Sequence, residues 1–217
     1  MISYLLSNVN WEEGFGSTLS RYLLTDVVKS EKIVFIPTSF DDPNKTEKYL
    51  RYNVAAFEMM GLAFKDIVVL SLDVDTIEVR NEIESADVIF LMGGDTLSQY
   101  NFIRNRDLTD CLRLFEGVMI GISAGAINMC STSILTLEHP SKDLHVYEGF
   151  GVVNLSVEVH FDINSIKQLE LLKEATNYVE EIYCITDFSS IRVSGDEVNI
   201  IGNDIYKYSE NNIVNLM

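Results

Sequence analysis

The chain has 217 residues, of which 47% are hydrophobic and 10% aromatic, as expected of a single globular domain spanning residues 1–217. Its 33 acidic and 16 basic residues give a formal charge of −17, which repels phosphate backbones and anionic lipid heads, so we expect neither nucleic acid nor membrane as a partner. The start lacks the basic segment of a signal peptide, and the three cysteines are dispersed. We therefore expect a cytoplasmic protein without disulfides, metal or cofactor.

Short β-branched runs alternate with longer amphipathic runs along the first part of the chain. In chain order we predict a strand Ile33–Pro37, a helix Lys45–Met60, a strand Asp66–Leu72, a helix Asp75–Ser85, a strand Val88–Met92, helices Thr96–Arg104 and Leu108–Phe115, a strand Val118–Ile122 and a helix Ala124–Met129. Strands that are apolar throughout and separated by helices indicate a mostly parallel sheet covered on both faces. The predicted fold is a doubly wound, flavodoxin-like α/β domain.

The remainder of the chain begins in the same style and then changes. A strand Val152–His160, a helix Ser165–Glu180 and a strand Ile182–Thr186 are predicted first. Three short runs joined by turn residues then predict antiparallel hairpins at the sheet edge: Ile191–Val193, Val198–Ile201 and Ile205–Tyr208. In open α/β sheets the functional site forms beyond the carboxyl ends of the strands. Three predicted segment ends fall there: Gly93-Gly94, Ser123, and His160 with Asp187.

The segment Gly121-Ile122-Ser123-Ala124-Gly125 matches the G-x-S-x-G pattern of a nucleophile elbow. It follows an apolar strand and opens a predicted helix, which is the context that such an elbow requires. Small neighbours allow the sharp turn that exposes a serine. Without a catalytic role, Ser123 would simply cap the helix. The flanking strand and helix favour Ser123 as a nucleophile.

A serine nucleophile needs a base and an orienting acid. His139 and His145 lie in a polar stretch, whereas His160 ends a predicted strand, so we predict His160 as the base. Asp187 ends the next predicted strand and is the preferred acid, although Asp162 is closer in sequence and Asp187 would also suit a turn cap.

The order Ser123, His160, Asp187 argues against an α/β-hydrolase esterase, in which the acid precedes the histidine. Gly93-Gly94 ends the strand before the elbow strand and offers a backbone N–H to the same oxyanion that the N–H of Ala124 would face. The pair fits neither a phosphate loop nor a dinucleotide fingerprint, because the required lysine and third glycine are missing.

Together these motifs resemble the peptidase E family of serine peptidases, which includes aspartyl dipeptidases and, more distantly, cyanophycinases. The matching segments are Leu6-Ser7-Asn8, Gly93-Gly94-Asp95-Thr96, Gly121–Ala126, His160-Phe161 and Asp187-Phe188-Ser189. The resemblance implies a class I glutamine-amidotransferase-like fold with serine in place of the usual cysteine. It also implies Ser123 as nucleophile, His160 as base, and Gly94 and Ala124 as oxyanion donors.

Two positions depart from the family pattern. The family's third catalytic residue is usually Glu, where this chain has Asp187, and Glu138 falls at the place of another family acid, which makes it a candidate accessory acid. The arginine that reads an N-terminal Asp in the aspartyl dipeptidases has no counterpart between Phe161 and Thr186, where Lys167 is the candidate substitute. A lysine offers a point charge instead of a bidentate fork.

The sequence therefore predicts a serine peptidase that hydrolyses small peptides, is dipeptidase-like, and has a relaxed preference for N-terminal Asp. Its expected partner is a small peptide substrate, and we expect a monomer or small homo-oligomer. The alternative is a non-catalytic amidotransferase-like domain that binds a ligand.

Overall fold

The computed structural model describes residues 1–137, 142–202, 204–210 and 212–216. Its largest feature is a seven-stranded sheet with the order β11-β10-β1-β5-β4-β2-β3. The parallel part consists of β1 (Ile2–Leu6), β5 (Val118–Ile122), β4 (Val88–Leu91), β2 (Lys32–Ile36) and β3 (Asp66–Val69). The hairpin of β10 (Ser190–Ser194) and β11 (Glu197–Ile201) adds antiparallel to β1. The predicted α/β fold with a mostly parallel sheet is confirmed.

Helices cover both faces of this sheet. Neighbouring strand residues point to opposite sides, so each strand packs against helices on both faces. Phe35 packs in one core cluster with Phe57 of α2, and Val34 packs in the other with Ile83 of α3. The first cluster includes residues of α1 (Gly16–Asp26) and α2 (Pro43–Met59), and the second includes residues of α3 (Thr76–Glu84), α4 (Thr96–Arg104), α5 (Thr109–Arg113) and α6 (Ala124–Met129). Burial on both faces explains why these strands are apolar throughout.

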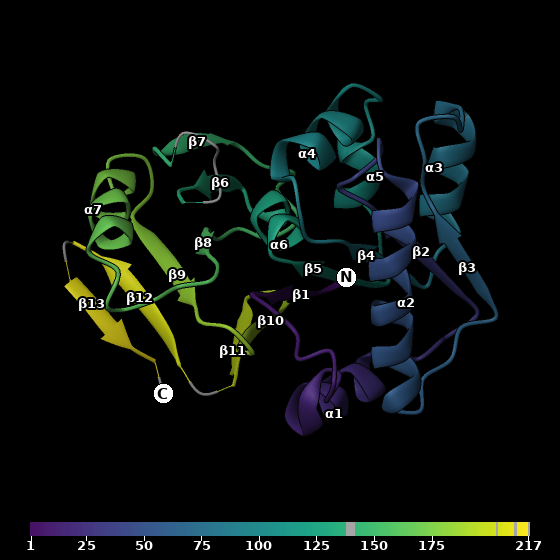
Figure 1. Cartoon of the computed structure of the whole chain (residues 1–217), viewed down its shortest axis with the longest axis horizontal. Coiled ribbons are helices and arrows are strands. Elements are labelled where there is room, and N and C mark those ends of the chain that lie inside the picture. The colour runs from purple at the N-terminus through teal and green to yellow at the C-terminus, as the bar shows by residue number, and fades with distance from the viewer. Residues whose placement is uncertain (138–141, 203, 211, 217) are drawn as a thin grey trace.

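A second sheet lies beside the first, and Figure 1 shows it with helix α7 on the opposite side of the molecule from β3. Its strand order is β13-β12-β9-β8. The members are β8 (Val157–Glu158), β9 (Glu181–Ile185), β12 (Ile205–Ser209) and β13 (Asn212–Asn215), and α7 (Ile166–Ala175) packs against them through Leu172 and Ala175. A separate hairpin joins β6 (Thr132–Leu135) to β7 (His145–Glu148).

The strand predicted over Val152–His160 is wrong in both length and place. Only Val157–Glu158 is a strand, and it pairs in parallel with β9 in the second sheet. Gly151 has φ 67°, and the N–H groups of Val152 and Val153 both donate to the carbonyl of Met129 (2.9 and 3.1 Å). This stretch is therefore bound to the end of α6 instead of a sheet.

The C-terminal prediction is partly corrected as well. The hairpin of β10 and β11 turns at Gly195 (φ 58°) on the edge of the main sheet, as expected. The run Ile205–Tyr208, however, pairs with β9 and β13 in the second sheet, not with β11. None of the described helices combines the length and apolar character that crossing a bilayer requires. One domain spanning residues 1–217 stays a prediction.

Candidate active site

Ser123 lies in the turn between β5 and α6, with φ 51° and ψ −109°. A positive φ is strained for any residue with a side chain, and such strain gathers at functional sites. Neither of the flanking glycines has room for a side chain. A Cβ on Gly125 would lie 2.3 Å from the carbonyl oxygen of Leu91, and one on Gly121 would lie 2.6 Å from the carbonyl carbon of Gly125. Close packing of strand, turn and helix thus explains the G-x-S-x-G spacing.

His160 follows β8 and meets Ser123 from the second sheet. Its Nε2 is 2.9 Å from Ser123 Oγ, a hydrogen-bond distance. The His160 backbone also has a positive φ, 50°, and its N–H donates to Ser7 Oγ (2.7 Å). The next N–H, of Phe161, donates to the carbonyl of Ile185 in β9 (3.1 Å). The loop that carries His160 is therefore fixed at two successive residues.

Asp187 follows β9 and completes a line of three side chains. Its Oδ1 is 2.7 Å from His160 Nδ1. Ser7 Oγ donates to the same oxygen (3.0 Å), and Asn8 Nδ2 donates to Oδ2 (3.4 Å). Burial raises the pKa of Asp187, but hydrogen bonds from His160, Ser7 and Asn8 and the charge of His160 outweigh burial and hold the pKa below its ordinary value. The carboxylate is therefore ionised at neutral pH.

Gly93-Gly94 follows β4 and lies beside the serine. Gly94 has φ 130°, and a Cβ there would lie 2.3 Å from Thr38 Oγ1, while a Cβ on Gly93 would lie 3.4 Å from Ser123 Cβ. Thr38 Oγ1 donates to the carbonyl of Gly93 (2.7 Å) and holds the turn. The N–H of Ser123 is already used by the carbonyl of Leu6 (2.8 Å). The oxyanion roles of Gly94 and of Ala124, the first residue of α6, stay predictions.

A buried polar cluster supports the ends of β2 and β4, and no sequence motif predicts it. Gln99 Nε2 donates to the carbonyl of Ile36 at the end of β2 (2.9 Å) and to that of Met92, which follows β4 (3.1 Å). Asn128 Nδ2 donates to Gln99 Oε1 (3.2 Å), and Tyr147 OH donates to Asn128 Oδ1 (2.9 Å). Satisfied networks of this kind rigidify a core and fix strand ends.

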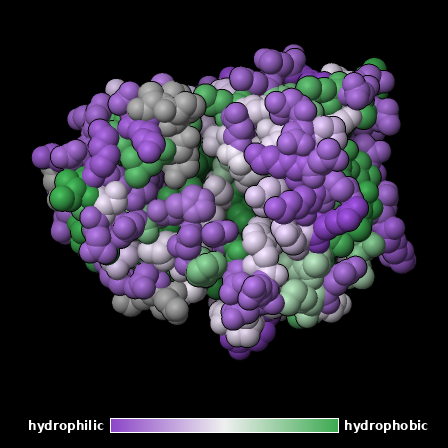
Figure 2. Space-filling model, in the orientation of Figure 1, coloured by the Kyte–Doolittle hydropathy of each residue, from purple (hydrophilic) through white to green (hydrophobic). Residues whose placement is uncertain are grey.

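A cavity of about 410 Å³ opens next to Ser123 and His160. Besides those two residues, it is lined by the turn after β4, by the end of β5, by the loop after β1 and by one side of α2: Asn8, Trp11, Lys45, Tyr49, Asn53, Met92, Gly93, Gly94 and Ile122. The α2 residues were not predicted as site residues, because their helix gives no sequence sign that it faces the serine. Figure 2 shows a groove with hydrophobic residues at its base between the α7 side and the α2 side of the molecule.

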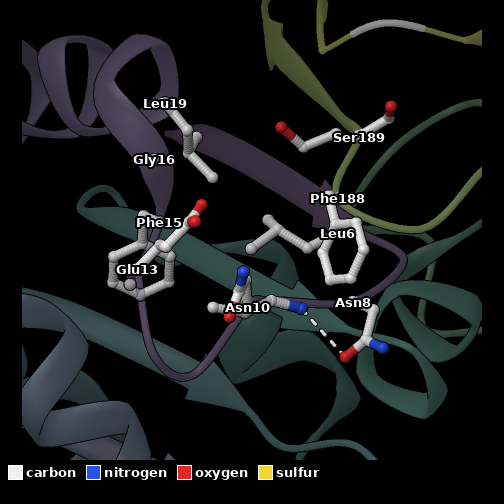
Figure 3. Close-up of a pocket in the computed structure, with 12 residues that line it drawn as sticks. Leu6, Asn8, Asn10, Glu13, Phe15, Gly16, Leu19, Phe188 and Ser189 are labelled. Carbon is white, nitrogen blue, oxygen red and sulfur yellow. Dashed lines mark hydrogen bonds between the residues drawn. The ribbon is translucent and has the colours of Figure 1, made fainter.

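A smaller cavity, of about 170 Å³, lies next to the Asp187 loop. Figure 3 shows Phe188, Leu6 and Asn8 on one side of it and Glu13 and Phe15 on the other. Asn8 lines both cavities. The smaller cavity lacks Ser123 and His160 among its lining residues, and the larger one is therefore the candidate substrate site.

The remaining candidates from the sequence are not part of this line of side chains as far as the structure describes them. Glu138 and His139 fall outside the described residues. Lys167 is exposed on α7 and is not among the residues that line the larger cavity. Asp162 does not orient His160, because its Oδ1 accepts hydrogen bonds from the backbone and side chain of Asn164 (2.9 and 3.1 Å).

Comparison with known proteins concerns the family and the fold of the chain. The family model of peptidase family S51 matches residues 5–201. A peptidase from an acI-B1 actinobacterium has 18% identity and a TM-score of 0.70, with 99% of this chain and 96% of that chain covered. A protein of Listeria monocytogenes EGD-e, assigned provisionally to peptidase E, has 20% identity and a TM-score of 0.67, with 92% and 96% covered. At these identities the two structures show the fold alone. No curated protein matches the chain significantly.

Proposed function

Because this chain belongs to peptidase family S51 and is thus a serine-type peptidase, we propose that it cleaves small peptides through an acyl-enzyme formed on Ser123. The observation that carries this proposal is the line of hydrogen bonds from Ser123 Oγ to His160 Nε2 (2.9 Å) and from His160 Nδ1 to Asp187 Oδ1 (2.7 Å). A nucleophile, a base and an orienting acid in this order define a catalytic triad by geometry. The alternative of a non-catalytic domain does not suit a member of this family.

In the proposed acylation step, His160 Nε2 takes the proton of Ser123 Oγ while Oγ attacks the peptide carbonyl carbon. The carbonyl oxygen becomes an oxyanion that accepts hydrogen bonds from the N–H groups of Gly94 and Ala124. His160 then gives its proton to the departing amine, and the C–N bond breaks. Water deacylates the serine by the reverse sequence, with His160 again as base, and the acid product leaves.

Asp187 performs the orienting role in this proposal, although the family more often has Glu. Its carboxylate accepts from Nδ1–H of His160, which keeps Nε2 free to receive the serine proton. Ser7 and Asn8 hold the two oxygens of Asp187, so the shorter side chain is fixed from both sides. The low pKa of Asp187 means that the carboxylate stabilises the imidazolium formed during catalysis without taking its proton.

We propose a dipeptidase-like enzyme with only a relaxed preference for N-terminal Asp. Among the residues that line the larger cavity, Lys45 is the one lysine or arginine, and it offers a point charge instead of a guanidinium fork. Arg192 does not serve as a substitute, because its Nε and Nη2 bind the carboxylate of Asp26 (2.6 and 3.0 Å). A cavity of about 410 Å³ suits one or two residues of a peptide.

A fluorophosphonate probe tests the nucleophile directly. We expect one covalent adduct on Ser123, located by peptide mass spectrometry, and no adduct on Ser123→Ala. A dipeptide library that includes Asp-X and N-blocked members then tests the substrate class. Absence of labelling on the wild-type protein, or labelling that persists in Ser123→Ala, would contradict the proposal.

A further inference from the structure

The larger cavity differs in charge from the rest of the molecule. Its described lining contains one lysine or arginine, Lys45, and no Asp or Glu. The whole chain, by contrast, carries 33 acidic and 16 basic residues. A cavity lined in this way offers an ion-pair partner to an anionic group of a ligand and none to a cationic group.

Lys45 is accessible to a bound ligand. The residue is exposed, and its backbone N–H donates to Asp42 Oδ1 (3.0 Å) at the start of α2, which fixes where the side chain begins. Its Nζ makes no ion pair within the described part of the chain. Because the four-carbon stem is flexible, the ammonium is free to approach a group bound in the cavity.

Two aromatic side chains line the cavity together with Lys45. Tyr49 lies one turn further along α2, on the same face of the helix, and is 38% exposed. Trp11, in the loop after β1, stacks on Tyr52 with ring centroids 5.7 Å apart, and Tyr49 meets the ring of Tyr52 edge-on at 6.1 Å. Tyr52 thus holds the two lining rings in place. Fixed rings of this kind offer apolar surface to a side chain of the ligand.

The proposed proton transfer determines where the leaving residue binds. His160 Nε2 gives its proton to the departing amine, so the leaving residue lies next to His160. Asn8 Nδ2 donates to Asp187 Oδ2 (3.4 Å), which places the start of the loop after β1 on that same side. Trp11 lies three residues further along this loop and contacts α2 through Tyr52. The lining formed by Trp11 and α2 therefore begins on the side of the leaving residue.

We propose that Lys45 binds the free α-carboxylate of the leaving residue and that Trp11 and Tyr49 contact its side chain. The enzyme then prefers dipeptides whose C-terminal residue is apolar or aromatic. In a dipeptide the α-carboxylate lies one residue, about 4 Å, beyond the carbonyl that Ser123 attacks. A cavity of about 410 Å³ spans that distance. This inference rests on the proposed function and defines its substrate class.

The N-terminal residue of the substrate is recognised less strictly in this arrangement. The described lining has no carboxylate for the substrate ammonium. Once Lys45 is paired with the α-carboxylate, the same lining has no further lysine or arginine for the side chain of an N-terminal Asp. The relaxed preference for N-terminal Asp proposed above follows from this distribution of charge.

Binding to Ser123→Ala separates this inference from catalysis. Isothermal titration with Ala-Leu, its C-terminal amide and N-acetyl-Ala-Leu measures affinity without turnover. We expect Ala-Leu to bind about fivefold more tightly than the amide at low salt, and this advantage should shrink as ionic strength rises. Acetylation of the N-terminus should weaken binding less than amidation of the C-terminus.

Lys45→Met, on the same background, tests the carboxylate contact. The ratio of acid to amide affinity should fall to one or below, because the carboxylate then meets only the negative net charge of the protein. Lys48→Met is the matched control. It removes the same charge from the same helix, and Lys48 is exposed and is not a lining residue of the cavity. It should leave the ratio unchanged.

Tyr49→Ala tests the aromatic contact. We expect Ala-Phe to bind about fivefold more tightly than Ala-Gly before this change, and the ratio should approach one after it. The hydrogen bond from Asn53 Nδ2 uses the backbone carbonyl of Tyr49 (2.8 Å) and is kept in the variant. Tyr178→Ala is the matched control, because Tyr178 is 63% exposed and does not line the cavity.

Several results would overturn the inference while the proposed function stands. These are equal or tighter binding of the amide, an acid-to-amide ratio that survives Lys45→Met, and equal binding of Ala-Phe and Ala-Gly. Loss of Asp-Leu affinity relative to Ala-Leu in Lys45→Met, with the acid-to-amide ratio unchanged, would show that Lys45 instead binds the substrate side chain. Failure of the proposed function has its own signature, namely hydrolysis that persists in Ser123→Ala.

Discussion

At the scale of single residues, the candidate site depends on contacts that join distant parts of the chain. Ser123 follows β5 of the main sheet, while His160 and Asp187 follow the parallel neighbours β8 and β9 of the second sheet. Ser7, which follows β1, contacts both His160 and Asp187. Its hydroxyl donates to Asp187 Oδ1 and accepts from the N–H of His160. Ser7 therefore connects the two sheets at the point where the proposed chemistry occurs.

The first residue-scale prediction concerns Ser123→Ala and His160→Ala. Each should lower kcat for any peptide that the wild type cleaves by at least about a thousandfold, because the serine and its base act as one unit. The double variant should be little worse than either single variant. Steady-state kinetics checks this, with His145→Ala in β7 as the control, which should keep activity within a few fold. A severe loss in His145→Ala alone would contradict the assignment of His160.

The second residue-scale prediction concerns the effect of Ser7→Ala on the pH dependence of kcat/KM. Burial raises the pKa of Asp187, and the Ser7 hydroxyl is one of the groups that lower it, so its loss should move that pKa upward. A carboxylate with a lowered pKa stops orienting His160 only in strong acid. Beyond the fall of kcat/KM that protonation of the base His160 causes, the further fall caused by protonation of Asp187 should therefore lie at higher pH in the variant than in the wild type, measured between about pH 3 and pH 6.

Ser3→Ala is the matched control for this change. Ser3 is a buried serine of β1, the strand that Ser7 follows, and is not among the groups that hydrogen-bond Asp187. Its replacement should leave the acid side of the profile unchanged. An unchanged profile in Ser7→Ala, with the fold intact by circular dichroism, would show that Ser7 does not tune Asp187.

At the scale of elements, the elbow is the best example of a feature that the sequence predicts fully. Val118–Ile122 and Ala124–Met129 begin and end where their patterns indicate, since an apolar strand, small turn residues and good helix formers agree with one another. By contrast, the helix predicted over Ser165–Glu180 stops at Ala175. The side chains of Thr176 and Asn177 bind the carbonyls of Lys173 and Glu174 (2.7 and 2.9 Å) and compete with further helical turns.

The second sheet could not be predicted for a different reason. β8 has only two residues, and its alternation continues from a stretch that binds α6 instead of a strand. β12 has an ordinary strand pattern, but nothing local distinguishes pairing with β11 from pairing with β9, which is distant in sequence. The same holds for Asn53 and Lys45, whose role as cavity lining depends on how α2 packs and not on any motif.

Glycine replacement tests the element-scale explanation of the elbow. Gly125→Ala puts a Cβ 2.3 Å from a backbone oxygen, which cannot move without separating β4 from α6, so the free energy of unfolding should fall by about 3 kcal/mol or more. Gly195→Ala is the control, because it has open space and only its φ of 58° is unfavourable, which costs about 1–2 kcal/mol. Urea denaturation measures both. An equal loss in the two variants would contradict close packing as the reason for Gly125.

At the scale of the whole molecule, a partly buried ion pair joins the end of α1 to the main sheet. Arg192 of β10 binds Asp26 through Nε and Nη2 (2.6 and 3.0 Å), and Tyr4 of β1 donates to the same carboxylate. Side-chain exposures are 13% for Arg192 and 8% for Asp26. In a chain with 33 acidic and 16 basic residues, this arginine neutralises a carboxylate that folding buries.

Asp26→Asn should lower the free energy of unfolding by about 3 kcal/mol near neutral pH, because it leaves the buried guanidinium without its anion. Burial raises the pKa of Asp26, but hydrogen bonds from Arg192 and Tyr4 and the charge of Arg192 bring it below the ordinary value of 3.8. A carboxyl whose pKa is lowered by folding stabilises the protein above its unfolded pKa, and that contribution is lost as the pH falls through the folded pKa. The difference in the free energy of unfolding between wild type and variant should therefore be constant above about pH 5 and shrink below pH 3.8.

Urea denaturation at a series of pH values measures this difference. Asp66→Asn is the control: the Asp66 side chain is 60% exposed and lies 3.8 Å from Lys32 Nζ, so its replacement should change stability little. A difference that stays constant into strong acid would show that Asp26 acts through packing and not through its charge.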